Sequence, residues 1–273
     1  MIRISGLTTS NKFLRDSVLH KMNLFTHGDS NTYGSELVEN KPWPVLLSNK
    51  LECDVENFAK PGFSNDRIIR DTIGYVTNNL NKSDNLIVII GFTEMSRTEF
   101  FSDELKSWIS IETGNINNER IPYSKEYYTK FHSFVSDGIL FWQKVLLLQS
   151  FLKLYKIKYI FFSCFRDSLI EKYFFNNNLV PKHLKVLESD SISAKTKYKK
   201  YEKELSSRVQ YLNKNILSQI DESKFVGLRE AYTIYNFEKN KKCLRGQYGH
   251  LLEDGHINWS NHLYDNYVQN YGD

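Results

Sequence analysis

The sequence predicts an α/β fold in which helices cover a mostly parallel sheet. Strand-length apolar runs alternate along the chain with longer segments of helical periodicity, and this order is typical of a layered α/β sandwich with right-handed crossovers. Residues 86–91 (LIVIIG) form a continuous, largely β-branched run, as expected for a strand buried on both faces. No internal repeat and no linker rich in Gly, Pro or Ser divides the 273 residues. We therefore expect one decorated domain over 1–273.

In the N-terminal half, apolar runs predict three strands, at residues 22–27, 55–59 and 86–91. A helix is expected to begin near Trp43 or Pro44, because proline is tolerated in a first helical turn. Ser64 can cap a second helix over 65–80, where apolar residues recur at helical spacing.

The C-terminal half continues the alternation. Strands are predicted at 157–164 and 225–228, and helices at 134–155, 193–220 and 261–269. Two stretches, about 101–131 and 167–223, are longer than a crossover requires. We expect them to be helical insertions over the sheet, such as lids or an oligomer surface.

Composition argues against several classes of protein. With Lys+Arg 36 against Asp+Glu 32, the formal net charge is only +4, which does not favour a nucleic-acid partner. The basic, Tyr-containing stretch 195–203 (KTKYKKYEK) is more typical of a solvated helix face. The three cysteines lie far apart without a Cys-x-x-Cys pair, which suits a reducing compartment rather than a disulfide framework or a zinc finger.

The sequence gives no indication of a membrane protein. No apolar segment reaches the length that a bilayer requires, and the first residues lack the pattern of a signal peptide, so we expect a cytoplasmic protein. The abundance of Asn, Lys, Ile, Tyr and Phe is typical of an AT-rich genome, such as that of a small bacterium or a phage. We attribute that bias to ancestry rather than to function.

Polar segments follow the predicted strands, and ligands of open parallel sheets bind at the carboxyl ends of the strands. The sequence GDS at 28–30 follows the first strand, residues 57–65 follow the second, and GFTE at 91–94 follows the third. A further polar segment, EDGHINWSNH, occupies 253–262. We expect these segments to converge at one edge of the sheet.

At these positions the chain resembles the SGNH, or GDSL-type, hydrolases. The resemblance rests on FTHGDSNTYGSEL, NFAKPGFSND, IVIIGF and EDGHINWSNH, in that order, and covers about half of the chain. It implies a flavodoxin-like, three-layer α/β/α sandwich. It also implies a serine esterase that uses no cofactor and no metal and deacylates a carbohydrate or another small polar ester.

The resemblance implies that Ser30 is the nucleophile. A hydroxyl becomes nucleophilic when a neighbouring imidazole removes its proton, and His256 is the expected base. A carboxylate orients such a base and stabilises the imidazolium. We favour Asp254 for this role, with Glu253 as the alternative because the family usually places the acid three residues before the histidine.

For the oxyanion, the resemblance implies the backbone N–H groups of Ser30 and Gly62 as donors. Where the family has an Asn in the third block, this chain has Thr93, whose shorter hydroxyl carries a single proton. Loss of one well-placed donor typically costs about 10²–10³ in rate. Further candidates around the site are Asn65, Arg97 and Asp29.

Two alternatives remain open. The same residues could transfer an acyl group to a sugar if water were excluded. Alternatively, the chain is a catalytically inactive SGNH-like module with a binding or structural role, for example in a virion or in surface-glycan machinery, as the replacement at Thr93 favours. Of the other histidines, we expect structural roles for His27 and His262 and no metal at His250.

Overall fold

The computed structural model describes residues 22–38, 41–112, 123–132, 134–164, 214–228, 233–234, 237 and 241–272. Most of the insertion expected at 167–223 lies outside the described residues, as does most of the helix expected over 193–220.

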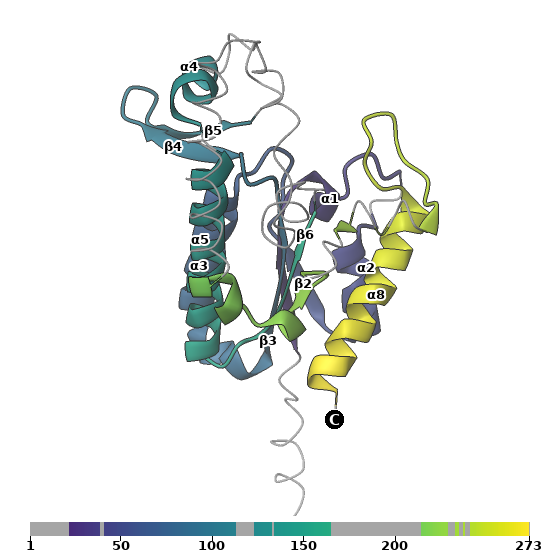
Figure 1. Ribbon diagram of the computed structural model, residues 1–273. Helices are drawn as coiled ribbons and strands as arrows, with labels where there is room; N and C mark the ends of the chain where they lie inside the picture. Colours follow the sequence, from purple (N-terminus) through teal and green to yellow (C-terminus); the bar gives the residue numbers. More distant parts are fainter. Residues whose placement is uncertain are drawn as a thin grey trace, which may run out of the picture.

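The described strands form a parallel five-stranded sheet in the order β2-β1-β3-β6-β7 (Figure 1). Their bounds are β1 (Asn23–His27), β2 (Asp54–Asn57), β3 (Leu86–Phe92), β6 (Lys158–Ser163) and β7 (Phe225–Val226). Each predicted strand is confirmed, with small shifts at its ends. This order is that of flavodoxin-like sheets, and it reverses direction between β1 and β3.

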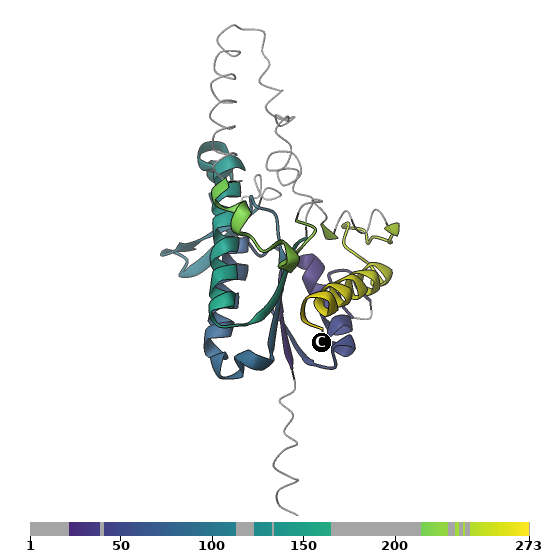
Figure 2. The same ribbon diagram turned by 60° about the horizontal axis from the view of Figure 1, so that its bottom comes forward.

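The reversal explains the three layers. The chain moves outward from β1 to β2 through α2 (Trp43–Lys50) and back across to β3 through α3 (Asn65–Asn78). Because crossovers are right-handed, opposite directions place the connecting helices on opposite faces. α2 and α8 (Glu253–Tyr271) cover one face, and α3 and α5 (Phe134–Leu154) cover the other (Figures 1 and 2).

Alternate residues of the central strands supply two hydrophobic cores. Val88 and Ile90 of β3 pack on the side of α3 and α5, in a cluster that contains Trp142. Ile87 and Ile89 pack on the side of α2 and α8, in a cluster that contains Trp259. The unbroken apolar run of β3 is therefore needed, because both faces of this strand are buried.

Helix α8 is longer than the sequence predicted. It begins at Glu253 rather than near residue 261, so the EDGH segment forms its first turn instead of a loop. Glu253 and Asp254 suit that turn, because acidic side chains interact favourably with a helix N-terminus. Gly255 fits because a Cβ there would collide with the side chain of Leu251.

The first insertion is partly a β-hairpin, so the helical insertion expected at about 101–131 is wrong for its first half. β4 (Thr98–Ser102) and β5 (Ser107–Ile111) pair antiparallel, with Phe101 opposite Trp108. Aromatic cross-strand pairs stabilise such hairpins. Helical turns follow in α4 (Ser124–Glu126) and the π-helical Tyr127–Phe131.

Short 3-10 turns precede two of the strands, at Leu80–Asn85 before β3 and at Leu217–Gln219 and Glu222–Lys224 before β7. Within the described ranges, none of the helices has both the length and the apolar character of a membrane span.

Candidate active site at the carboxyl edge of the sheet

The candidate nucleophile lies directly after the central strand β1. Gly28 makes this turn possible, since a Cβ would come within 2.8 Å of the carbonyl oxygen of Gly91. Asp29 then caps the short helix α1 (Ser30–Tyr33) by accepting a hydrogen bond from the backbone N–H of Asn31 at 3.0 Å. Ser30 is 6% exposed. Its hydroxyl forms no hydrogen bond with any residue that the structure describes.

The loops after β2 and β3 flank Ser30, because β1 lies between these two strands. Gly62 follows Pro61 in a turn that the backbone hydrogen bond from Phe63 to Lys60 closes. Its φ of 79° is in the left-handed region that favours glycine, and a Cβ there would meet nothing within 4 Å. Gly62 thus borders open space on the side where a side chain would stand.

Side-chain hydrogen bonds connect the loop after β3, which carries Thr93, to the segments that follow β1 and β2. The hydroxyl of Thr93 donates to Asp29 at 3.3 Å. The amide of Asn65 donates to the carbonyl oxygens of Thr93 and Glu94 and accepts from the N–H of Thr93. In this arrangement the donors of Thr93 and Asn65 are already used, so either side chain would have to rotate before it could hold an oxyanion.

The buried Asp29 carboxyl interacts electrostatically with Arg97. Burial raises the pKa of the Asp29 carboxyl, against the positive charge of Arg97, which lowers it. Arg97 also forms ion pairs with Glu94 at 3.7 Å and Glu112 at 3.5 Å. It lines a cavity of about 50 Å³ together with Asn65, a space suited to water rather than to an ester substrate.

His256 is fully buried in the first turns of α8, and it forms no hydrogen bond with Ser30 in the described part of the chain. Its Nδ1 accepts a hydrogen bond from the backbone N–H of Trp43 at 3.0 Å, so the neutral ring carries its proton on Nε2. This Nε2 is buried and has no hydrogen-bond partner among the described residues. Burial lowers the pKa of His256 to about 4. The ring would have to leave Trp43 before it could accept a proton from Ser30.

The carboxylates of both candidate acids accept hydrogen bonds from backbone N–H groups. Asp254 accepts hydrogen bonds from the N–H of Leu244 at 3.1 Å and of Gly255 at 2.8 Å. Glu253 accepts from the N–H of Val38 at 3.2 Å, and its charge raises the pKa of His256 against the effect of burial. Within the described residues, neither carboxylate hydrogen-bonds to His256.

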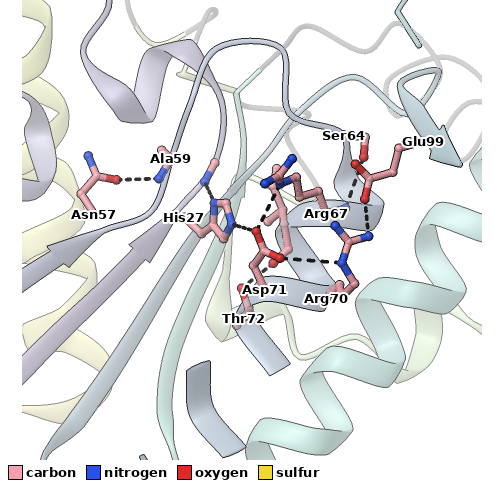
Figure 3. A network of polar contacts seen from close by, with 11 residues as sticks. His27, Asn57, Ala59, Ser64, Arg67, Arg70, Asp71, Thr72 and Glu99 are labelled. Carbon is pink, nitrogen blue, oxygen red and sulfur yellow. Dashed lines mark hydrogen bonds and ion pairs between the residues drawn. The ribbon is translucent and has the colours of Figure 1, made fainter. Parts of the chain in front are cut away.

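A polar network beside the Ser30 loop was not predicted (Figure 3). His27 accepts the backbone N–H of Gly28 on Nδ1 at 2.9 Å, and its Nε2 lies 3.5 Å from Asp71. Asp71 also pairs with Arg67 and Arg70 of α3. The spacing of Arg67 and Asp71, four residues apart on a predicted helix, is the signal that could have revealed the pair.

A second contact that the sequence analysis missed joins Glu36 to His250. The carboxylate of Glu36 lies 2.7 Å from Nδ1 of His250 and accepts the backbone N–H groups of Tyr248 and His250. These bonds, led by that from Tyr248, lower the pKa of Glu36. The pair fastens the segment after α1 to the turn that precedes α8. Nothing in the sequence spacing of Glu36 and His250 signals it.

Among the described residues, no group of three or more His, Cys, Asp or Glu side chains is arranged to hold a metal.

Three solved structures are similar to this chain at 12% sequence identity. A member of the lipolytic protein G-D-S-L family from Veillonella parvula DSM 2008 matches with a TM-score of 0.41 over 92% of this chain and 98% of that chain. TesA matches with 0.35 over 91% and 97%, and LAE5, an α/β hydrolase enzyme from the metagenome of Lake Arreo, Spain, with 0.37 over 91% and 94%. Similarity at this level does not identify an activity.

No curated protein matches the chain. The model of one family, DUF6071, matches residues 22–174. This range contains Ser30, Gly62 and Thr93 and ends before His256. Because the match spans more than half of the sequence, the chain belongs to DUF6071, a family of unknown function.

Proposed function

We propose that the protein is a serine-dependent hydrolase of carboxylic esters, with Ser30 as the nucleophile. The observation that carries this proposal is the place of Ser30 after β1, at the point where the strand order reverses between β1 and β3. Open α/β sheets bind their ligands at this point. A carbohydrate or another small polar ester is the proposed substrate.

In the proposed reaction, the Ser30 hydroxyl attacks the ester carbonyl and the alcohol leaves, so that an acyl-enzyme forms and water then hydrolyses it. The backbone N–H groups of Ser30 and Gly62 would hold the negative oxygen, since Gly62 borders open space. His256 is the proposed base, which it becomes once its Nδ1 releases the N–H of Trp43. Glu253 or Asp254 would then orient the ring.

The test combines hydrolysis of p-nitrophenyl acetate with covalent labelling by a fluorophosphonate. We expect the wild-type protein to be labelled and to hydrolyse the ester, and Ser30→Ala to lose both. His256→Asn keeps an acceptor for Trp43 but cannot act as a base, and we expect it to lower kcat by about 10²–10⁴-fold. Activity that survives in Ser30→Ala would disprove the assignment of the nucleophile.

A second candidate function is an inactive module with a binding or structural role. Two contacts favour it, namely the hydrogen bond from Trp43 to His256 and the commitment of the Thr93 hydroxyl to Asp29. Both remove groups that catalysis would need. Folded wild-type protein that neither hydrolyses the ester nor reacts with the fluorophosphonate would support this candidate.

A further inference from the structure

The guanidinium group of Arg67 is held in one orientation at the edge of the candidate site. Its Nε donates to Oδ2 of Asp71 at 3.4 Å, and its Cζ lies 4.2 Å from the centre of the Phe63 ring. An arginine that is both hydrogen-bonded and stacked loses little further conformational freedom when it binds a ligand. The side chain is still 35% exposed, so solvent and solutes reach it.

The two terminal nitrogens of Arg67 are available. Neither Nη1 nor Nη2 forms a hydrogen bond within the described residues. Arg70, one helical turn on, gives a contrast, because its Nη1 donates to Glu99, its Nε pairs with Asp71, and Trp108 covers it at 4.0 Å. The charge of Arg70 is thus committed, whereas Arg67 presents an unused pair of donors.

Arg67 is linked to the Ser30 loop through Asp71 and His27 (Figure 3). The same Oδ2 atom of Asp71 that accepts from Arg67 lies 3.5 Å from His27, which in turn accepts the N–H of Gly28. On the other side, Phe63 directly follows the oxyanion candidate Gly62. The stacking of Arg67 on Phe63 places its guanidinium beside the turn that carries Gly62.

The donors of Arg67 favour a carboxylate. A planar guanidinium edge matches two carboxylate oxygens, and such bidentate bonds are among the stronger ones in proteins. A phosphate monoester carries nearly two negative charges, and Asp71 next to Arg67 would repel the second. A singly charged carboxylate meets less of this repulsion and needs only the two terminal nitrogens of Arg67.

We propose that Arg67 binds a carboxylate on the ester substrate, so that the protein acts on anionic esters in preference to neutral ones. This proposal rests on the proposed function and adds the substrate class to it. Arg67 is a specificity-determining residue here and takes no part in bond making or breaking.

The experiment compares 4-acetoxybenzoate with its neutral analogue methyl 4-acetoxybenzoate, which has the same acetyl group to transfer. We expect Arg67→Gln to lower the ratio of kcat/KM for the charged ester to that for the neutral ester by about tenfold, and Arg67→Lys to lower it less. Lys60→Gln removes an equal charge from the turn before Gly62, and its ratio should stay within about twofold of the wild-type value. An Arg67→Gln ratio equal to that of Lys60→Gln would overturn the proposal.

A binding measurement separates this proposal from the proposed function. Isothermal titration calorimetry of 4-acetoxybenzoate into Ser30→Ala, and into Ser30→Ala combined with Arg67→Gln, requires no turnover. We expect the second protein to bind about tenfold more weakly. If the wild type hydrolyses neither ester but this difference is found, the carboxylate site stands and the hydrolase assignment fails. Equal affinities would overturn the carboxylate site even in an active enzyme.

Discussion

Helices α2 and α3 begin at the same edge of the sheet, on opposite faces, but their first turns are held in different ways. Ser64 caps α3 locally, because its hydroxyl accepts the N–H of Arg67 at 3.2 Å. The N-cap of α2 is Pro42, whose side chain has no acceptor, and the N–H of Trp43 donates to His256, 213 residues further along the chain. One cap is a property of the local sequence, and the other exists only in the folded chain.

This difference bears on the candidate site. A local cap leaves the rest of the molecule unconstrained, whereas the cap of α2 uses the imidazole that the sequence predicts to be the catalytic base. His256 therefore stabilises the fold as it stands, and any catalytic use of its Nδ1 lone pair or of the opposite tautomer removes that hydrogen bond. The folded state and the proposed catalysis therefore need the His256 ring in different hydrogen-bonding states.

The largest effect is expected for the cap of α2. His256→Ala leaves the N–H of Trp43 buried without a partner and opens a cavity, so we expect it to lower the free energy of unfolding by about 4 kcal/mol. His256→Asn keeps an acceptor near Nδ1 and should recover part of this loss. Urea unfolding at neutral pH measures both, and equal losses in the two variants would contradict the capping role.

Protonation should weaken the same cap. Burial lowers the pKa of His256 to about 4, from 6.5 in the unfolded chain, so the unfolded state binds more protons between these values and stability falls as the pH falls through this window. We expect the wild type to lose about 2 kcal/mol more than His256→Asn between neutral pH and about pH 5. Parallel urea titrations at the two pH values test this. His27 is common to both proteins, so its own depressed pKa cancels in the comparison. Identical pH profiles would show that His256 is not held neutral by burial.

The smallest effect is expected for the local cap. Ser64→Ala removes the acceptor for the N–H of Arg67 and should cost about 1 kcal/mol in urea unfolding. Ser64→Thr keeps the hydroxyl and serves as the matched control. If Ser64→Ala lowered the free energy of unfolding as much as His256→Ala does, the proposed difference between the two helix caps would be wrong.

The sheet and the local caps could be predicted because their signals are local. The continuous apolar run of β3 and the Ser64 cap of α3 each depend on neighbouring residues, and both are confirmed. The early start of α8 was missed, because a glycine such as Gly255 is typical of a loop. The side chain of Leu251, which leaves no room for a Cβ at position 255, lies beside it only in the folded chain. The β4–β5 hairpin was missed for a similar reason, since its aromatic pair becomes evident only when the strands face each other.

At the candidate site, sequence order could place loops but not hydrogen bonds. The predicted convergence of the loops carrying Ser30, Gly62 and Thr93 follows from the adjacency of β2, β1 and β3. The orientation of His256, by contrast, is set by Trp43 of the neighbouring helix α2, and that of Thr93 by the buried Asp29. The catalytic roles of Ser30 and His256 stay predictions.

The position of β1 also determines how the candidate site opens. β1 is hydrogen-bonded on both sides, to β2 and β3, while β2 and the short β7 lie at the edges of the described sheet. Local unfolding begins where few contacts must break, so amide hydrogens of edge strands exchange with solvent before those of central strands. Ser30 therefore follows one of the last strands expected to open, whereas Gly62, in the loop after the edge strand β2, is expected to loosen earlier.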